Sequence, residues 1–431
     1  MTKRGPDTGV CIAAVVISIA AVSAGYSSYV RALDSRGDFF ALYEASRHAI
    51  ETGRLSDPLS VGYYPPSGRP ILMLLAISHT PWIAAVCWWA ISAGLYGLCI
   101  YLLVRHLLPG KCSSRVRLAM AALIALLVWL VSDLAVGNVS SLVLASVVVS
   151  YFLYRKRYVL PSALVLSIGI VTKLLPILLL VFYLVRRRWT VSMMTIVCTL
   201  AVGILPGVLI FGRADFIASW KTWYDHAMSI RTARHTIMDS DRATFMNQAW
   251  PNILLRTLHP VSAGHEKKPF YVNIASLSQS LILKIWLGLA VTSGLLWVIL
   301  IWPRSSDWPG GEHVRFALVP LAMIWFSPHV MSYYMTLITP ALVILIWAII
   351  ERRETMSSMR YSLAGLGAIY ILGCISTASD YARALGTYQM VVLALAVGIF
   401  LIIRQMNKSA SPAVEGHRIG EEPVSELETQ K

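Results

Sequence analysis

The stretch TVSMMTIVCTLAVGILPGVLIF, from Thr190 to Phe211, decides the fold class. It carries no charged residue, and at 1.5 Å per residue a helix of this length crosses the roughly 30 Å hydrocarbon core of a bilayer. Similar runs extend from Val10 to Val30 and from Ile285 to Trp302. Because 57% of the residues are hydrophobic and only 14% are charged, the sequence predicts an all-α polytopic membrane protein.

The same pattern along the chain predicts about 12 transmembrane or partly spanning helices. They are expected near residues 10–30, 82–104, 118–135, 139–154, 159–172, 174–185, 190–211, 280–302, 316–327, 331–350, 361–376 and 387–404. They form one transmembrane domain, 1–404, with external loops at 31–81 and 212–279 that carry short interfacial helices. The first span is too long for a cleaved signal peptide and is interpreted as a retained anchor. Residues 405–431 are polar and predict a disordered cytoplasmic tail.

The net charge of +15 would point to nucleic acid in a soluble protein. Here Lys and Arg gather in short segments between apolar runs, which is the positive-inside pattern of membrane topology. The expected partner is therefore the lipid bilayer, and nucleic-acid binding is not expected. The clusters expected on the cytoplasmic side are Lys3/Arg4, Arg105 with Lys111, Arg115 and Arg117, Arg155-Lys156-Arg157, Arg186-Arg187-Arg188, and Arg352-Arg353.

Two spans are unusually short. The clusters at 155–157 and 186–188 must both face the cytoplasm, yet only about 28 residues separate them, against roughly 40 for two full crossings. Thr172-Lys173-Leu174-Leu175-Pro176 stands at the midpoint. We expect the chain to turn there within the membrane, where irregular backbone survives only against protein or a watery cavity. A second proline break is predicted at Phe326-Ser327-Pro328-His329.

This topology brings polar side chains from distant segments to the external face. They are Asp38, Asp133, Asn138, Lys173, Asn247, Gln248 and His329. Ionisable groups at membrane depth are costly and mark functional candidates. Asp38 suits a general base, although an Asp before Phe-Phe-Ala-Leu also suits a helix N-cap. Lys173 suits an anionic group such as phosphate, although a lysine can also snorkel to the interface.

The other candidates carry weaker patterns. His329 can donate, accept or carry a proton, but a single histidine is as often structural. Asp133 and Asn138 also fit a loop or cap pair. In the second external loop, Arg234 suits phosphate and the amides and aromatic rings suit sugars, whereas an interfacial aromatic belt explains most of the tryptophans. The sequence holds no Gly-rich phosphate loop, His-Glu-x-x-His motif or acidic metal cluster, so no metal or cofactor is expected.

Taken in order, the short motifs form a recognisable series. They are Gly37-Asp38 with Tyr43, Tyr64-Pro65-Pro66, Gly137-Asn138, Lys173 with Pro176, Asn247-Gln248, and Ser327-Pro328-His329 with Tyr333-Tyr334. The series resembles the GT-C glycosyltransferases of family 87, which include membrane mannosyltransferases. The likeness covers most of residues 10–350.

The resemblance implies transfer of a sugar from a polyprenyl-phosphate donor to a hydroxyl of a glycolipid or glycan acceptor. Mannose is the leading candidate for the sugar. The reaction would be inverting and would face the periplasm or exterior of a bacterial inner (plasma) membrane. Asp38 matches the catalytic aspartate; Lys173, with His329 and Arg234, would bind the donor phosphate. Substrate contacts would come from Tyr43, Tyr64, Asn138, Asn247, Gln248 and Tyr333. A transporter or flippase of a lipid-linked or anionic substrate and a non-enzymatic scaffold remain alternatives.

Overall fold

Long apolar helices joined by short helical pieces make up the computed structural model of the chain. The structure describes residues 8–55, 64–107, 112–231, 233–238, 243–303, 310–351 and 360–418. Within these ranges, seven helical segments are long and apolar enough to cross a membrane: Gly9–Leu33, Pro81–His106, Arg115–Val136, Trp189–Phe211, Gln279–Ile301, Ser332–Ile350 and Thr387–Asn407. The polytopic all-α fold is therefore confirmed.

The helices follow the expected positions closely. Their bounds are α1 Thr8–Leu33, α2 Gly37–Thr52, η1 Pro66–Gly68, α4 Arg69–Leu72, η2 Met73–Ala76, α5 Pro81–Leu102, η3 Leu103–Leu107, α6 Cys112–Val136, α7 Ser140–Arg155, α8 Val159–Thr172, α9 Ile177–Val185, α10 Trp189–Phe211, α11 Arg213–Arg231, α12 Ala233–Met238, α13 Trp250–Leu258, α14 Gln279–Ile301, α15 Gly311–Phe316, α16 Leu318–Trp325, η4 Ser332–Ile338, α17 Thr339–Glu351, α18 Arg360–Ile375, η6 Ser376–Ala378, α19 Asp380–Ala384 and α20 Thr387–Arg418.

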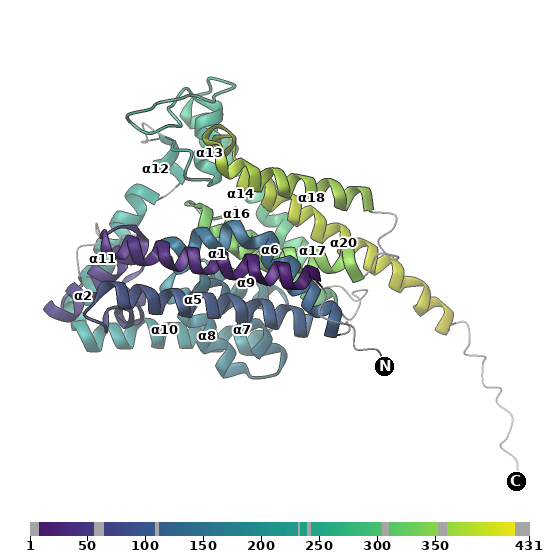
Figure 1. Cartoon of the computed structure of the whole chain (residues 1–431), viewed down its shortest axis with the longest axis horizontal. Helices are drawn as coiled ribbons and strands as arrows, with labels where there is room; N and C mark the ends of the chain where they lie inside the picture. Colours follow the sequence, from purple (N-terminus) through teal and green to yellow (C-terminus); the bar gives the residue numbers. More distant parts are fainter. Residues whose placement is uncertain are drawn as a thin grey trace, which may run out of the picture.

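The spanning helices run side by side, and the chain returns repeatedly through the same bundle (Figure 1). Helix α8 packs between α7 and α10, and α1 packs against α5 and α6. The η4–α17 segment is mostly buried and contacts α6, α16 and α20. Helices α12 and α13 rise from one end of the bundle, at the upper left of Figure 1. The buried centre consists mainly of Leu, Ile, Val and aromatic side chains.

Both predicted breaks occur. Helix α8 ends at Thr172 and α9 begins at Ile177, and between them Lys173 is extended, with φ −153° and ψ 125°. The second break separates the end of α16 at Trp325 from the start of η4 at Ser332. Proline explains both positions, because its ring and missing N–H oppose continuation of a helix.

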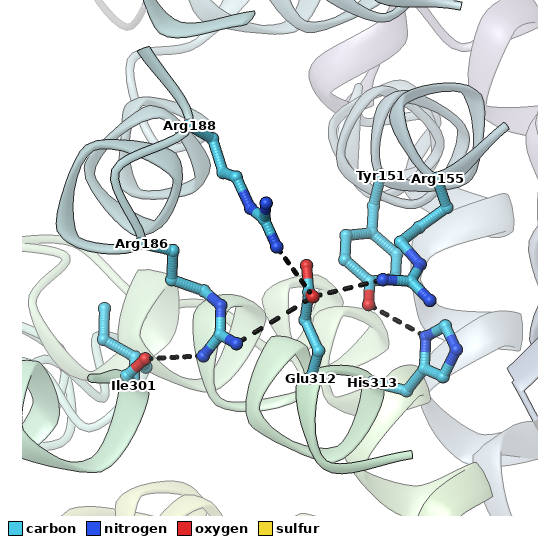
Figure 2. Close-up of polar contacts among 7 residues, drawn as sticks. All are labelled: Tyr151, Arg155, Arg186, Arg188, Ile301, Glu312 and His313. Atoms are coloured by element: carbon cyan, nitrogen blue, oxygen red, sulfur yellow. Dashed lines mark hydrogen bonds and ion pairs between the residues drawn. The ribbon is translucent and has the colours of Figure 1, made fainter. Parts of the chain in front are cut away.

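The two basic ends of the α8–α9 hairpin meet at one carboxylate, as Figure 2 shows. Glu312 Oε2 lies 3.1 Å from Arg155 Nη1, 3.4 Å from Arg188 Nη2 and 3.9 Å from Arg186 Nη2. Arg155 precedes α8, whereas Arg186 and Arg188 follow α9. We call these four residues the Glu312 cluster. It fixes both basic segments at the end of the bundle opposite Lys173, in agreement with the predicted turn.

Glu312→Gln is expected to lower the free energy of unfolding by about 1–3 kcal/mol, below the 3–5 kcal/mol of a fully buried broken pair. The expected loss of stability is smaller because the Arg155 and Arg188 side chains are 38% and 42% exposed to solvent, although Glu312 is only 10% exposed. Thermal unfolding in detergent measures the change. Glu51→Gln, which alters an exposed pair with Arg47, is the control and should have less than half of this effect; equal losses would contradict the expectation.

The segment 212–279 contains three helices, α11, α12 and α13, as expected of a loop that carries short helices. One region departs from the sequence prediction. Residues 405–418, predicted to be disordered, continue α20 as far as Arg418. Their polarity marks where the chain leaves the apolar layer, but Gln, Met, Lys and Ala are good helix formers and do not end a helix. Residues 419–431, the Lys3/Arg4 and Arg352-Arg353 clusters and Lys111 lie outside the described residues.

Candidate active site

Asn138 joins Asp38 to Lys173. Its Nδ2 donates to Asp38 Oδ2 at 2.7 Å and to the Tyr64 hydroxyl at 3.2 Å. On the other side of the same amide, Lys173 Nζ donates to Asn138 Oδ1 at 3.4 Å. The amide orientation is fixed chemically, because a carboxylate requires the NH₂ group and an ammonium requires the oxygen. One buried side chain thus holds a carboxylate and an ammonium in one site.

Two glycines bring Asp38 and Asn138 together. Gly37, with φ +90°, opens α2, and Asp38 lies in the first turn of that helix. The N-cap position is Arg36, so the N-cap interpretation of Asp38 is wrong. Gly137, with φ +72°, precedes Asn138, and a Cβ atom there would lie 2.6 Å from Phe39 Cβ. Only glycine fits both this backbone conformation and this close approach.

The Lys173 ammonium lies among three tyrosine rings. Its Nζ is 4.1 Å from the ring centroid of Tyr334, 5.7 Å from that of Tyr64 and 5.9 Å from that of Tyr333. Tyr333 also lies close enough to Asp38 for the two side chains to interact electrostatically. Aromatic faces attract a cation without neutralising it. Within the described residues no carboxylate pairs directly with this ammonium, so its charge is available to an anion.

Tyr64 connects the cluster to the segment between α2 and α5. Burial, together with the negative charge of Asp38, raises the pKa of the Tyr64 hydroxyl well above its usual value, so it stays neutral. The segment that follows is pressed against the end of α8. Ser67 Oγ donates to the Val171 carbonyl at 3.2 Å, and a Cβ on Gly68 would lie 2.6 Å from that carbonyl oxygen.

Arg69 is a site neighbour that the sequence analysis missed. Its side chain is buried on α4, and burial lowers the pKa of the guanidinium to about 10, while Tyr64 acts in the opposite direction. Arg69 therefore remains a cation near neutral pH and adds positive charge beside Tyr64. The signal was present, because Arg69 belongs to the same short Pro- and Gly-rich segment as Tyr64-Pro65-Pro66.

Asn247 and Gln248 lie elsewhere, where they fasten the loop before α13 to the second break. Asn247 Oδ1 accepts from the Val330 amide at 2.9 Å and from the Ala249 amide at 3.0 Å. The backbone N–H of Gln248 donates to the Val330 carbonyl at 2.7 Å. Arg256, buried on α13, donates from Nη1 to the Asn247 carbonyl at 2.7 Å. The described side-chain hydrogen bonds of both predicted substrate residues are therefore with protein backbone.

Three other predicted residues are also outside the Asn138 contacts. The Tyr43 hydroxyl donates to the Ser78 carbonyl at 3.0 Å, which holds α2 against the turn before α5. His329 is half-buried, and its carbonyl accepts from Ser327 Oγ at 2.7 Å. Arg234 is exposed on α12, and no described contact joins it to Asp38 or Lys173.

Two apolar cavities open on the sides of the bundle. The first, which we call the α10 groove, has a volume of about 520 Å³ and is lined by Ser67, Ile170, Val171, Leu174, Thr199, Leu200, Gly203, Ile204, Val208, Arg213, Phe216, Ile217 and Trp220. The second, the α14 groove, has a volume of about 570 Å³ and lies between α14, α16 and α20. Both are lined largely by segments that cross the apolar layer.

The model of glycosyltransferase family 87 matches residues 63–314, more than half of the chain. The chain belongs to glycosyltransferase family 87. This confirms the family suggested by the ordered motifs, and the protein is a glycosyltransferase of the membrane-embedded kind. No curated protein and no solved structure matches the chain. The matched segment includes Tyr64, Asn138 and Lys173, whereas Asp38 and Tyr333 lie on either side of it.

In this glycosyltransferase, Asn138→Ala is expected to lower kcat/KM by about 10–100-fold. This corresponds to about 1–3 kcal/mol, the usual cost of leaving a buried polar group without its hydrogen-bond partner. The change removes the amide that orients Asp38 and Lys173 together. Initial rates of sugar transfer measure it. Asn273→Ala, which removes only a local bond to Ala275, is the control. An Asn138 variant with wild-type kinetics would contradict the bridging role.

Proposed function

We propose that this glycosyltransferase moves a sugar from a polyprenyl-phosphate donor to a hydroxyl of a lipid-linked or cell-envelope glycan. Mannose is the leading candidate for the sugar. The observation that carries the proposal is the Asn138 amide, which holds the Asp38 carboxylate and the Lys173 ammonium in one cluster. A carboxylate can accept the proton of an acceptor hydroxyl, and an ammonium can hold a phosphate.

The proposed reaction is a single inverting displacement. Asp38 takes the proton from the acceptor hydroxyl as its oxygen forms a bond to the anomeric carbon. The bond from that carbon to the phosphate oxygen breaks, and polyprenyl phosphate leaves with the electron pair. Lys173 stabilises the negative charge that grows on the phosphate, and such stabilisation is strongest where water is excluded. Asp38 then returns its proton to solvent.

The α10 groove supports a donor with a long apolar chain. Its lining includes Val171 and Leu174, which flank Lys173 in sequence, and Ser67 from the segment that follows Tyr64. A chain in this groove would therefore end at the turn that carries the ammonium. Arg213 lines the same groove at the start of α11 and supplies a second cation. An apolar channel with positive charge at its end fits an isoprenoid phosphate.

The extracytoplasmic position of the site is supported by charge. Lys173 and the arginines of the Glu312 cluster lie at opposite ends of the α8–α9 hairpin. Basic residues near the ends of spanning helices favour the cytoplasmic side. We therefore propose that Asp38 faces the periplasm or exterior of a bacterial plasma membrane.

Ile204→Trp is expected to raise KM for a polyprenyl-phosphate donor by about tenfold, or about 1.4 kcal/mol, because the indole ring would occupy space that the donor chain needs. Ile204 lines the α10 groove and is 45% exposed. Leu205 is the matched control: it is the next residue on the same helix, is 59% exposed and does not line the groove. Leu205→Trp should keep the wild-type KM. Equal effects of the two variants would remove the support that the groove gives to this donor.

Purified protein in liposomes, supplied with radiolabelled polyprenyl-phosphate mannose and extracted membrane lipids and glycans, tests the function itself. Transfer of label to a new product supports the enzyme. Movement of the unchanged donor across the bilayer without transfer would instead support the transporter alternative. Parallel assays with arabinose and glucose donors test the choice of mannose.

A further inference from the structure

Two of the tyrosines beside Lys173 belong to η4, a 3₁₀ helix of seven residues, Ser332–Ile338. Hydrogen bonds in a 3₁₀ helix have poor geometry, and runs longer than roughly three or four residues are uncommon. A segment of this kind depends on contacts with its neighbours. Because the rings of Tyr333 and Tyr334 lie beside the Lys173 ammonium, whatever fixes η4 also fixes the surroundings of that charge.

Helix α6 packs on η4 and is connected to it at two points. The first is a contact of 2.8 Å between Ser132 Oγ and Ser332 Oγ, at the first residue of η4. The second starts at Asp133, the next residue on α6. Asp133 Oδ2 lies 2.6 Å from the Tyr96 hydroxyl oxygen, which in turn lies 3.0 Å from Thr336 Oγ1. Both η4 tyrosines of the site lie between these two points.

The hydrogen atoms along the second connection can be counted. Thr336 Oγ1 donates its hydrogen to the Tyr333 carbonyl at 2.8 Å, so it accepts in its contact with Tyr96. The phenol of Tyr96 has a single hydrogen, which it then donates to Thr336. The 2.6 Å contact between Tyr96 and Asp133 therefore requires a hydrogen on Asp133. A carboxylate cannot supply one, whereas a neutral carboxylic acid can.

The surroundings of Asp133 also suit an uncharged acid. The residue is 1% exposed, and its Oδ1 has no hydrogen-bond partner among the described residues. Ser140, another hydroxyl close to Asp133, donates instead to Asn138 Oδ1 at 3.2 Å. Lys173 is near enough to interact electrostatically, yet no ion pair joins it to Asp133 in the part of the chain that the structure describes. A buried ionised carboxylate with so few donors would be costly.

We infer that Asp133 is a positioning residue that works as a neutral carboxylic acid. It donates to Tyr96, and the chain of hydrogen bonds continues through Thr336 to the Tyr333 carbonyl. This chain holds η4 and its tyrosines beside Lys173. Because Asp133 is buried, it acts through η4 and not on a substrate. Its neutrality also leaves the Lys173 charge to a phosphate, and this last point rests on the proposed function.

Ionisation of Asp133 would reverse the chain. Tyr96 would turn its only hydrogen towards the carboxylate, and Thr336 would turn its own hydrogen towards Tyr96 and release the Tyr333 carbonyl. The segment η4 would lose one of its two connections to α6. A second negative charge would also act on the site beside that of Asp38, and it would repel a phosphate at Lys173.

Infrared difference spectroscopy of the full-length protein in detergent, near neutral pH, tests the protonation state without turnover. Asp133→Asn is the matched variant, because Asn has nearly the same shape and can donate from Nδ2 to Tyr96. The spectrum of the wild type minus that of Asp133→Asn should contain the carbonyl stretch of a protonated carboxyl group, which shifts in D₂O. Carboxylate stretches in its place would overturn the inference.

Sugar-transfer kinetics test the positioning role. Asp133→Leu cannot donate to Tyr96 and should lower kcat/KM by about 10–100-fold, whereas Asp133→Asn should recover it to within about threefold of the wild type. Equal losses in the two variants would contradict the inference. Inhibition by polyprenyl phosphate should be the same in Asp133→Asn and the wild type. Stronger inhibition of Asp133→Asn would reveal a negative charge in the wild type and would overturn the neutral assignment.

Tyr96→Phe breaks the same chain while leaving Asp133 in place, so it tests the connection even if Asp133→Leu does not fold. It should lower kcat/KM by about tenfold. Tyr101→Phe is the control, because Tyr101 lies on the same helix, is 50% exposed and accepts a hydrogen bond only from the nearby Arg105 among its described contacts. Wild-type kinetics in Tyr96→Phe would contradict the connection.

The infrared result does not depend on the sugar donor, so it separates this inference from the proposed function. A protonated Asp133 in a protein that transfers no sugar from polyprenyl phosphate would contradict the proposed function alone. Normal transfer from that donor, together with carboxylate stretches from Asp133, would contradict this inference alone.

Discussion

Asp38→Asn should lower kcat by about 10²–10⁴-fold, the usual contribution of a positioned general base. Asn has nearly the same size as Asp, and its oxygen can still accept the hydrogen bond from Asn138 Nδ2. It cannot take a proton from a hydroxyl near neutral pH. The loss should therefore fall on the chemical step and leave binding of the polyprenyl-phosphate donor intact. Single-turnover rates and equilibrium binding of labelled donor measure the two separately.

Asp34→Asn is the matched control for Asp38. Asp34 lies four residues earlier in the same connection, is exposed, and is 3.8 Å from Arg36. Its replacement makes the same chemical change outside the Asn138 contacts and should leave kcat unchanged. Near-normal transfer by the Asp38 variant, or an equal loss in the Asp34 variant, would end the assignment of Asp38 as the base.

Lys173→Met should lower kcat/KM by about 10²–10³-fold, as removal of one group that stabilises developing negative charge does in other enzymes. Met keeps an unbranched apolar stem and packs favourably beside aromatic rings, so the site among Tyr64, Tyr333 and Tyr334 should stay filled. What is lost is the positive charge. Inhibition by the product polyprenyl phosphate should weaken in parallel, because that molecule carries the phosphate which Lys173 holds in the proposed mechanism.

Lys284→Met controls for the loss of a lysine. Lys284 is exposed on α14, and its replacement should change neither kcat/KM nor product inhibition. The Asp38→Asn/Lys173→Met double variant is informative as well. Both side chains bond to Asn138. The loss of kcat/KM in the double variant should therefore be smaller than the product of the two single losses. Unchanged product inhibition in Lys173→Met would refute phosphate binding by this residue.

The bilayer made much of the fold predictable from sequence. Backbone groups in hydrocarbon must be satisfied within a helix, so apolar length alone located the spans, and Pro176 and Pro328 located the breaks. Helix continuation beyond residue 405 could not be recognised in the same way. Outside the apolar layer, helix formation depends on weak local preferences, which the polarity of residues 405–418 does not reveal.

The site was predictable in part, because charges at membrane depth are rare. That reasoning selected Asp38, Asn138 and Lys173, which the structure brings together. It could not recognise Asn138 as the bridge, since the contact joins positions 100 residues apart and depends on how closely Gly137 packs on Phe39. It also could not show that the side chains of Asn247 and Gln248 fasten a loop, because an amide that binds a substrate and an amide that binds backbone are the same residue type.

The Glu312 cluster sets how deep Lys173 lies in the membrane. Helix α8, anchored near Arg155, has 14 residues, roughly 21 Å of rise at 1.5 Å per residue, against a hydrocarbon core of roughly 30 Å. Lys173 is therefore held several ångströms below the far lipid head groups, and in the proposed mechanism a phosphate must leave the head-group layer to meet it. Bilayer thickness thus becomes a determinant of turnover: a thicker membrane lengthens that descent, and a thinner one shortens it.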